Sequence, residues 1–408
     1  MPTLKITLAT QHQAERCVMC GLCLPHCPTY NKTQNEAESP RGRISLILGL
    51  AREQLQADDK LRSHLDNCLL CRACEVVCPS GVEFGTLMDG ARHALAQDRP
   101  RSEQRIPLDR LATDKQRQRR DAKLLWLADK TGLRALGRGL GLTRALGLAR
   151  FEQLAPEMRR PHDWQTYYPA RGETRGEVAL FIGCFSDMFD QATLDDSISL
   201  LTACGYGVHV PATQTCCGAL HQHSGDSASA RQLAQQNLDA FGALQLDAVI
   251  STATGCGAYL RDYEHIIGKA LPVCDINSFL SQIEWPDNLR MRPLNKRVAV
   301  HEPCSQRNVL KQADAPYVLL NRIPQLDLVS LPGNSQCCGA AGSYMIEHPA
   351  MADRLRQDKT DALARLSPDL LVSSNIGCAL HIAAGARAAG LRLEVVHPVT
   401  LLARQIAL

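Results

Sequence analysis

The sequence predicts an α/β protein that carries a separate α-helical domain at its N-terminus. The 18 cysteines form two blocks, Cys17–Cys78 and Cys184–Cys378, and each block contains an internal repeat. In the second block, short β-branched runs alternate with helical patterns, which is typical of α/β domains. We therefore expect a cysteine-rich helical domain at 1–98, a basic helical linker at 99–176, and two tandem α/β repeats at 177–290 and 291–408.

The composition is that of a globular protein without a strong electrostatic field. Apolar residues make up 45% of the 408 residues and charged residues 21%, which can fill a core and argues against a disordered chain. Lys and Arg number 45 against 42 Asp and Glu, and aromatic residues make up only 4%. Neither the charge nor the aromatic content favours nucleic-acid binding, so no nucleic-acid partner is expected.

The sequence predicts a cytoplasmic location, either free or peripheral on the cytoplasmic face of the inner membrane. No apolar stretch reaches the roughly 20 residues that span a bilayer. The N-terminal run MPTLKITLAT has no apolar core followed by a cleavage site. Because disulfides are rare in the cytosol, clustered cysteines there indicate metal ligands or redox groups.

The first block repeats the spacing C-x2-C-x2-C-x3-C-P after 51 residues, which is the signature of bacterial two-cluster ferredoxins. The N-terminal domain is therefore expected to be ferredoxin-like, with residues 40–66 forming a helix pair between the two loops. In that arrangement the fourth ligand of each cluster comes from the other copy. One [4Fe-4S] cluster is expected on Cys17, Cys20, Cys23 and Cys78, and a second on Cys27, Cys68, Cys71 and Cys74. Zinc is the alternative, but its sites use four ligands and often histidine.

The segment from Arg99 to Arg150 contains 14 Lys and Arg against 5 Asp and Glu, a local charge of +9. Leucine and arginine recur in it at helical intervals, although several glycines weaken the helical pattern. A basic amphipathic helix of this kind can lie on an anionic membrane surface. The alternative is a linker helix packed on its neighbours or on an acidic partner subunit.

The second block is a tandem duplication with three anchors at nearly constant offset. The anchors pair VALFIGC184 with VAVHEPC304, the Cys-Cys-Gly-Ala run at 216 with that at 337, and AVISTATGC256 with LLVSSNIGC378. The apolar runs are expected to be buried parallel strands, whose carboxyl ends would bring the anchors together. We expect Gly218 and Gly339 to let the backbone turn so that both preceding sulfurs face one site.

Each repeat thus offers four candidate ligands for a further cluster or redox site. They are Cys184, Cys216, Cys217 and Cys256 in the first copy, and Cys304, Cys337, Cys338 and Cys378 in the second. A redox-active dithiol is the open alternative. Cys204 and Cys274 have no repeat equivalents and are expected to be core residues. Three histidines lie near the anchors, for which packing or surface roles are favoured over ligation: His221, His223 and His381.

The chain resembles the iron–sulfur subunit of glycolate oxidase (glycolate dehydrogenase). The resemblance rests on RCVMCGLCLPHCPTY, SPRGRI, CLLCRACEVVCPSGV, CCGAL, TGCGAY, CCGAAGSY and NIGCALH. It implies an oxidoreductase complex in which an FAD-containing subunit oxidises a 2-hydroxy acid, beside a further flavoprotein-like subunit. This chain would carry the electrons on, towards a quinone at the membrane. FAD is expected only on the partner, since no G-x-G-x-x-G fingerprint is present here.

The resemblance leaves alternatives and one departure. The partner's substrate could be D-lactate or glycerol 3-phosphate, and the chain could be a heterodisulfide-reductase-like subunit. A redox-sensing iron–sulfur scaffold is an alternative of another class. The full Cys-Cys-Gly motif ends in C-x2-C, whereas Tyr259 and His381 stand at its last position here. Four cysteines in each copy put the noncubane clusters of the heterodisulfide reductase relatives in doubt.

Overall fold

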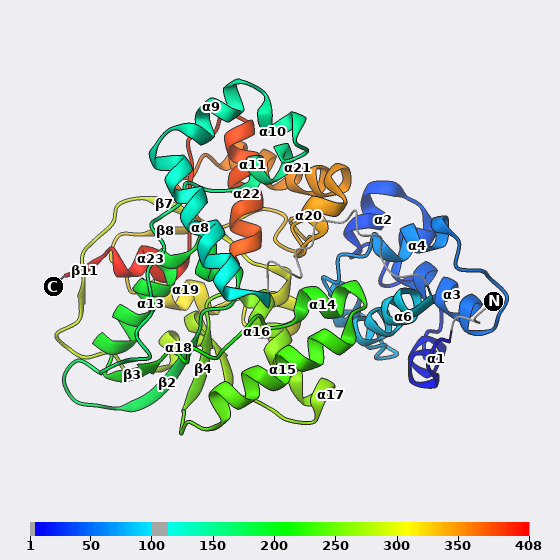
Figure 1. Cartoon of the computed structure of the whole chain (residues 1–408), viewed down its shortest axis with the longest axis horizontal. Coiled ribbons are helices and arrows are strands. Elements are labelled where there is room, and N and C mark those ends of the chain that lie inside the picture. Colours follow the sequence, from blue (N-terminus) through cyan, green and yellow to red (C-terminus); the bar gives the residue numbers. More distant parts are fainter. Residues whose placement is uncertain (1–4, 99–112, 408) are drawn as a thin grey trace.

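The computed structural model describes residues 5–98 and 113–407, and its N-terminal part is helical (Figure 1). The elements are α1 (Leu8–Glu15), α2 (Pro28–Thr33), the 3-10 helix η1 (Glu36–Glu38), α3 (Pro40–Ala51), α4 (Asp59–Asp66), α5 (Ala73–Val76) and α6 (Phe84–Asp98). The predicted helix pair is confirmed as α3 and α4. The side chains of Ser39 and Asp58 cap these helices by accepting hydrogen bonds from the backbone amides of Gly42 and Leu61.

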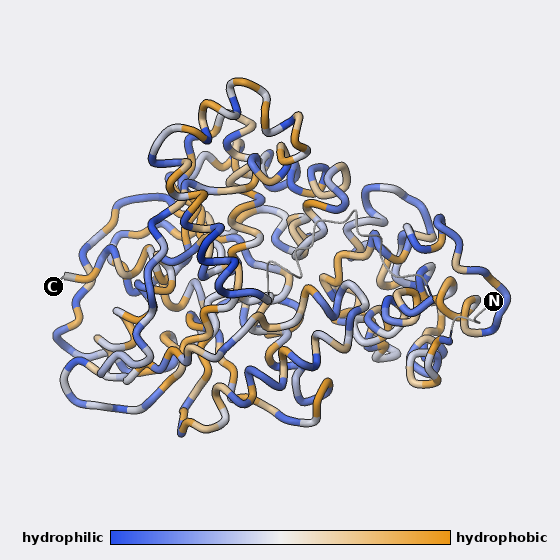
Figure 2. The backbone as a smooth tube through the Cα atoms, viewed as in Figure 1, coloured by the Kyte–Doolittle hydropathy of each residue, from blue (hydrophilic) through white to orange (hydrophobic). Residues whose placement is uncertain are grey.

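The described part of the basic segment, which we expected to be a helical linker, forms four helices. They are α8 (Lys115–Lys130), α9 (Leu133–Gly139), α10 (Leu142–Ala145) and α11 (Ala149–Leu154), and residues 99–112 of the expected linker lie outside the described residues. The helical conformation is interrupted at Gly132, Gly141 and Gly147. Their φ angles of 74°, 70° and 69° are far more favourable for glycine than for other residues. Hydrophobic and hydrophilic residues alternate along this segment, at the top of Figure 2.

The first repeat contains a five-stranded sheet in the order β1-β3-β2-β4-β5. Its elements are β1 (Tyr167–Tyr168), β2 (Gly176–Phe181), α12 (Phe185–Phe189), α13 (Gln191–Ala203), β3 (Tyr206–His209), α14 (Ala219–Ser224), α15 (Ser227–Gly242), β4 (Ala248–Ser251), α16 (Thr254–Arg261), α17 (Tyr263–Ile267), β5 (Val273–Asp275) and α18 (Ile276–Gln282). All strand pairs in it are parallel except β1 with β3. The short strand β1 comes from the segment expected to be linker.

The second repeat contains a parallel four-stranded sheet in the order β10-β9-β7-β8. Its elements are β7 (Arg297–His301), the π-helix η2 (Ser305–Leu310), α19 (Ala315–Leu320), β8 (Asp327–Ser330), α20 (Tyr344–Glu347), α21 (Pro349–Leu366), β9 (Leu370–Ser373), α22 (Ile376–Ala388), β10 (Glu394–Val396) and α23 (Pro398–Ala403). The short strands β6 (Arg290–Met291) and β11 (Ile406–Ala407) form a separate antiparallel pair. The strand order β3-β2-β4-β5 recurs as β8-β7-β9-β10, so the duplication in sequence is also one of topology.

The two sheets share one hydrophobic core. Val178 and Leu180 of β2 lie in the same cluster of buried side chains as Val298 and Val300 of β7. Helix α13 packs on α23 and α18 packs on α19, which ties the two repeats together. The opposite face of each sheet is covered by its own helices, α15 to α17 in the first repeat and α21 and α22 in the second. The shape is thus an α/β pair with the helical domain against it (Figure 1).

The helical N-terminal domain contacts both repeats. Its α6 packs on α14, where Asp89 and His223 form an ion pair at 3.1 Å, and Arg72 lies 3.3 Å from Asp262. On the other repeat, Lys32 lies 2.7 Å from Asp358. The cysteine loops are therefore held against the α/β pair. Among the described residues, no helix combines the length and apolar character that crossing a membrane requires.

Candidate metal centres

The two cysteine loops of the helical domain share one backbone conformation. Met19 and Leu70, which are 51 residues apart, both have positive φ angles, of 56° and 51°. The next such pair is Gly21 at 85° and Arg72 at 56°. Left-handed residues two apart curl each loop, so that consecutive cysteines can face one centre. A non-glycine residue in this conformation is uncommon, and Arg72 is held there by Glu75 at 2.8 Å and by its ion pair with Asp262.

The first predicted ligand set lines a single cavity. Its wall includes the side chains of Cys17, Cys20, Cys23 and Cys78, with Cys74 beside them. Cys78 and Cys74 come from the second loop. The structure therefore places Cys78 beside the three cysteines of the first loop with which it was predicted to share a cluster. Cys78 Sγ accepts a backbone N–H from Val82 at 3.5 Å, a contact that suits a charged sulfur. Cys20 is exposed to solvent.

The second predicted set is deeper in the molecule. Cys27 and Cys68 are buried, and both act electrostatically on the thiols of Cys71 and Cys74. Burial raises the pKa of Cys71 and Cys74 well above its ordinary value, and the neighbouring thiols raise it further. Metal binding requires thiolates, so binding of a metal centre would displace the protons of Cys71 and Cys74. The residues present in both sets fit a thiolate-bound cluster.

A buried arginine next to this second set is a functional residue that the sequence analysis missed. Arg43 is 1% exposed, and its Nη1 lies 4.0 Å from the Cys27 sulfur. It donates to Glu38 Oε2 at 2.6 Å, and Glu38 in turn contacts His64 Nδ1 at 2.6 Å. The SPRGRI run contains Arg43, but only the structure shows that its side chain faces the core. Gly42 in the same run is required because a Cβ there would lie 1.8 Å from the Glu36 carbonyl oxygen.

In the first repeat, the four predicted cysteines come together at the carboxyl ends of the strands. Cys184 Sγ lies 3.6 Å from Cys216 Sγ, and the Cys256 thiol is close enough to raise the pKa of Cys217. Gly218 has a φ of 94° and donates its N–H to Cys216 Sγ at 3.4 Å, so the expected turn is confirmed. The hydrogen bond from Cys184 lowers the pKa of the Cys216 thiol well below its ordinary value.

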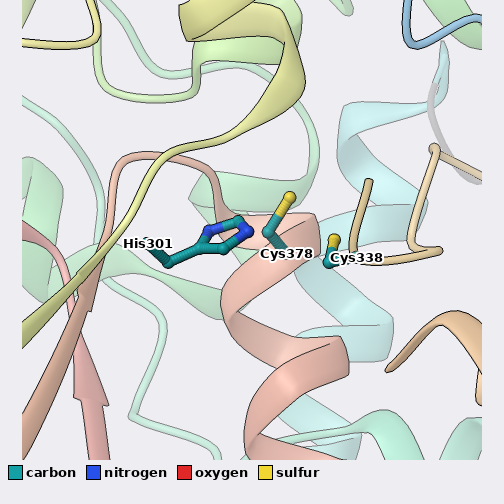
Figure 3. A group of neighbouring side chains, drawn as sticks. All are labelled: His301, Cys338 and Cys378. Atoms are coloured by element: carbon teal, nitrogen blue, oxygen red, sulfur yellow. The ribbon is translucent and has the colours of Figure 1, made fainter. Parts of the chain in front are cut away.

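In the second repeat the thiols meet in the same way, and a histidine joins them. Cys304 Sγ lies 3.9 Å from Cys337 Sγ, and the sulfurs of Cys338 and Cys378 lie within 4.8 Å of each other. The ligand atoms of His301, Cys338 and Cys378 all lie within 4.8 Å of one another, and all three side chains are buried (Figure 3). Gly339, with a φ of 88°, repeats the turn of the first copy. His301 was not predicted, because the histidine precedes its cysteine by three residues in a strand that looked purely structural.

The histidines that the sequence analysis singled out have other roles. His381 is fully buried against α21, with Nε2 3.2 Å from the Ala352 carbonyl oxygen, and burial lowers its pKa to about 4. His223 pairs with Asp89, while His221 is buried near Cys216. Packing therefore accounts for His381 and interdomain contact for His223.

The remaining two cysteines lie apart from these groups. Cys204 is fully buried in the shared core, as expected. Cys274 is partly buried at the edge of that core. Burial raises their pKa values to about 12 and about 11, so both stay protonated at neutral pH and are inert.

The second thiol set of the helical domain lies next to the thiols of the second repeat. Cys304 is, after burial itself, the largest influence that raises the pKa of Cys71, and Cys71 also acts on Cys337. Asn308 of η2 donates a hydrogen bond of 2.8 Å to the Cys71 carbonyl oxygen. Three groups of thiols therefore follow one another from the exposed Cys20 towards the interior.

Comparisons with known proteins agree with this arrangement. Residues 13–82 match the 4Fe-4S dicluster domain family, and residues 178–261 and 298–383 each match the cysteine-rich domain family. A solved structure, a hypothetical protein from Helicobacter pylori, has the same overall fold with a TM-score of 0.54, 12% identity, and coverage of 98% of this chain and 73% of that one. These matches define an iron–sulfur protein with one ferredoxin-type and two cysteine-rich domains.

Two curated relatives are similar over nearly their full length. The probable glycolate oxidase iron-sulfur subunit of Bacillus subtilis is 32% identical over 95% of this chain and 92% of its own. The glycolate oxidase iron-sulfur subunit of Escherichia coli is 30% identical over 91% of this chain and 90% of its own. The chain belongs to the family of glycolate oxidase iron–sulfur subunits.

Proposed function

We propose that this chain is the electron-transfer subunit of a glycolate-oxidising complex. A partner subunit that contains FAD oxidises glycolate to glyoxylate, a further flavoprotein-like subunit completes the complex, and a membrane quinone is the acceptor. Cys17, Cys20, Cys23 and Cys78 hold one [4Fe-4S] cluster, and Cys27, Cys68, Cys71 and Cys74 hold the other. When bound, such clusters supply one-electron carriers. The names of the two curated relatives support the complex and its substrate.

The observation that carries this proposal is the order of the thiol groups. Cys20 is exposed at one end, and Cys71 beside Cys304 lies at the other. A chain of closely spaced one-electron sites that begins at the surface suits transfer between partners, whereas a redox sensor would need only one site. Arg43 supplies a fixed positive charge beside Cys27 and Cys68, which stabilises the negative charge of the thiolates and of an added electron.

The surface next to Cys20 is suited to receive the flavoprotein subunit. Val18, Met19 and Leu22 in the first cysteine loop are 68%, 39% and 56% exposed. Apolar side chains gathered around an exposed redox centre favour a protein interface that excludes water from the transfer path. We propose this loop as the entry point for electrons from the flavoprotein subunit.

A second surface supports peripheral attachment to the membrane. On α9 to α11, which project at the top of Figure 1, a run of leucines is 47–71% exposed: Leu133, Leu136, Leu140, Leu142, Leu146 and Leu148. Exposed basic side chains flank them, among them Lys130, Arg138 and Arg144. Leucine and arginine together match the apolar and anionic layers of a cytoplasmic leaflet. The three arginines of α8, Arg117, Arg119 and Arg120, instead lie near Asp121 and Asp163.

The electron path is tested by serine substitution within the assembled complex. Cys20→Ser and Cys71→Ser should each remove about four irons and abolish quinone reduction, while glycolate still reduces the flavin of the partner. Cys204→Ser is the matched control, because that thiol lies in the core away from the thiol groups, and should leave quinone reduction intact. Quinone turnover that survives both Cys20→Ser and Cys71→Ser would contradict the proposal.

Membrane attachment is tested by flotation with anionic phosphatidylglycerol vesicles. Changing Leu136, Leu140 and Leu146 to Gln should remove most of the bound protein, and high salt should weaken binding of the unchanged chain. Leu8→Gln is the control, since Leu8 is 71% exposed on α1 at the other end of the molecule. Equal flotation of the triple variant and the unchanged chain would place the contact elsewhere.

A further inference from the structure

The two cysteine-rich repeats have the same fold, but different side chains surround their thiols. At the end of the central strand, Phe181 of β2 pairs in register with Ser251, and His301 of β7 pairs with Ser373 at the equivalent place. On the long helices, Asn237 of α15 corresponds to Lys359 of α21, as the equivalent contacts of Gly218 with Ala230 and Gly339 with Ala352 show. At these two positions the first site has an aromatic ring and an amide, whereas the second has an imidazole and a basic side chain; the imidazole near the first site, His221, comes instead from α14.

The imidazole of His301 is fixed in a position that allows it to bind a metal. It is 1% exposed, and Nδ1 lies 3.0 Å from Ser373 Oγ, which holds the ring and leaves Nε2 as the free nitrogen. The ring extends from the end of β7 toward the two thiols (Figure 3), with ligand atoms of His301, Cys338 and Cys378 within 4.8 Å of one another. A hydrogen bond from one ring nitrogen that orients the other is the usual support of a metal-bound histidine.

The environment of these ligands compensates the charge of a thiolate group. Lys359 is 1% exposed, and its Nζ donates to the Gly333 carbonyl oxygen at 2.6 Å. All four cysteines of the second repeat act electrostatically on this ammonium group. Asn375 Nδ2 donates to Cys378 Sγ at 3.4 Å. A buried ammonium group is costly unless it faces negative charge, and thiolates bound to a metal supply that charge.

In the first repeat, the side chains at the positions of His301 and Lys359 are Phe181 and Asn237, and neither is placed to bind a metal. Phe181 has no ligand atom, and Asn237 is engaged with the backbone, donating to the Cys216 carbonyl oxygen at 2.9 Å and accepting from the Thr215 amide at 2.8 Å. Among the described residues, the second repeat alone brings three potential ligand atoms of His, Cys, Asp or Glu within 4.8 Å of one another. The two copies are therefore not equivalent as metal sites.

We propose that the second repeat binds an iron–sulfur cluster through Cys304, Cys337, Cys338 and Cys378, with His301 as an additional imidazole ligand, and that the first repeat has no such ligand. This proposal rests on the proposed function, since its place after Cys71 makes the site the third carrier of the path. His301 would serve as the fifth ligand of this site, because the second repeat has only four cysteines. Replacement of cysteinate by neutral imidazole raises the reduction potential of a cluster, which suits a late position in the path.

The test is pulsed EPR on the complete, anaerobically purified chain labelled with ¹⁵N-histidine. The unchanged chain should hold roughly twelve irons, and one reduced signal should show coupling to a histidine nitrogen. His301→Gln should abolish that coupling. His301→Cys should keep the iron, lose the coupling and lower the midpoint potential of that signal alone. His381→Gln, a buried histidine of the same repeat that contacts Ala352, should change neither coupling nor potential.

The outcomes separate this proposal from the proposed function. A coupling that persists in His301→Gln, zinc in place of iron in the second repeat, or no third signal would overturn the histidine-ligated cluster. About eight irons with quinone reduction still dependent on Cys20 and Cys71 would remove this site and leave the proposed function intact. Turnover independent of Cys20 and Cys71 would remove the proposed function, whatever the nitrogen coupling shows.

Discussion

Asn308 at the beginning of the second repeat donates a hydrogen bond of 2.8 Å to the carbonyl oxygen of Cys71 in the helical domain. The two residues are distant in sequence, and their contact fixes the second cysteine loop against Cys304. Because the rate of electron transfer depends steeply on separation and orientation, we expect this contact to influence transfer between the two parts of the proposed path.

Asn308→Ala should therefore slow electron transfer between the helical domain and the second repeat without loss of iron from either. We expect iron content to stay unchanged, while quinone reduction by the assembled complex falls several-fold, since loss of one hydrogen bond of about 1 kcal/mol loosens the contact. Stopped-flow reduction of the iron–sulfur chromophore would locate the slow step after the first carriers. Asn321→Ala, at the exposed end of α19, is the control. Equal loss in both variants would show that the contact has no special role.

Gly42→Ala should destabilise the helical domain. A methyl group would lie 1.8 Å from the Glu36 carbonyl oxygen, so α3 and the preceding turn must separate. Overpacking of this kind costs about 1–3 kcal/mol or more, and we expect a lower melting temperature and faster loss of iron on dilution. Gly139→Ala in α9 meets nothing within 4 Å and should be neutral or mildly stabilising. An unchanged melting temperature in Gly42→Ala would count against the described packing.

Arg43→Met should remove the guanidinium partner of the buried Glu38 carboxylate and leave it with the neighbouring His64 contact. The Arg43–Glu38 pair is almost fully buried, with side chains 1% and 5% exposed, so removal of one member should cost roughly 3–5 kcal/mol. Differential scanning fluorimetry and an iron assay would measure the loss. The exposed pair of Arg52 and Glu15, at 3.3 Å, provides the comparison, and Arg52→Met should change the stability far less than Arg43→Met. Similar losses in both variants would contradict a special role for Arg43.

Asp190 should make stability depend on pH. Burial raises the pKa of Asp190 to about 7, above its value in the unfolded chain. Between the two values the folded chain holds one proton more than the unfolded chain, so stability falls as pH rises through this window. Asp190 should therefore lower the melting temperature of the unchanged protein by about 1–2 °C between pH 6 and pH 8, and Asp190→Asn should remove this contribution. A variant with the same pH dependence as the unchanged chain would refute the assignment.

The parts predicted most fully from the sequence are those in which chemistry dictates spacing. Thiolate ligation needs a fixed number of residues between cysteines, so the loops around Cys17–Cys27 and Cys68–Cys78 are visible in sequence. Apolar strands that precede Cys184 and Cys304 predicted both sheets and the meeting of distant anchors. The duplication itself was also visible in the sequence, whereas the order of the strands was not.

The side chains that tune these sites could not be predicted, because tertiary packing brings them in. Lys359 reaches the thiols from the middle of α21, and nothing in its helical neighbourhood distinguishes it from a surface lysine. Arg43 is one arginine among many until its burial is known. The basic segment seemed a candidate for an amphipathic helix, but Gly132, Gly141 and Gly147 adopt left-handed conformations and divide it into short helices.

The shared core has an evolutionary consequence. Because Val178 and Leu180 bury surface of the other copy's Val298 and Val300, neither half of the duplication can be discarded without exposing the interior of its twin. Selection on folding therefore preserves both halves even when only one retains a chemical task. The residues around the thiols of one copy can therefore change, while the residues of the shared core cannot. The difference between Phe181 and His301 at equivalent positions is the kind of change that this constraint permits.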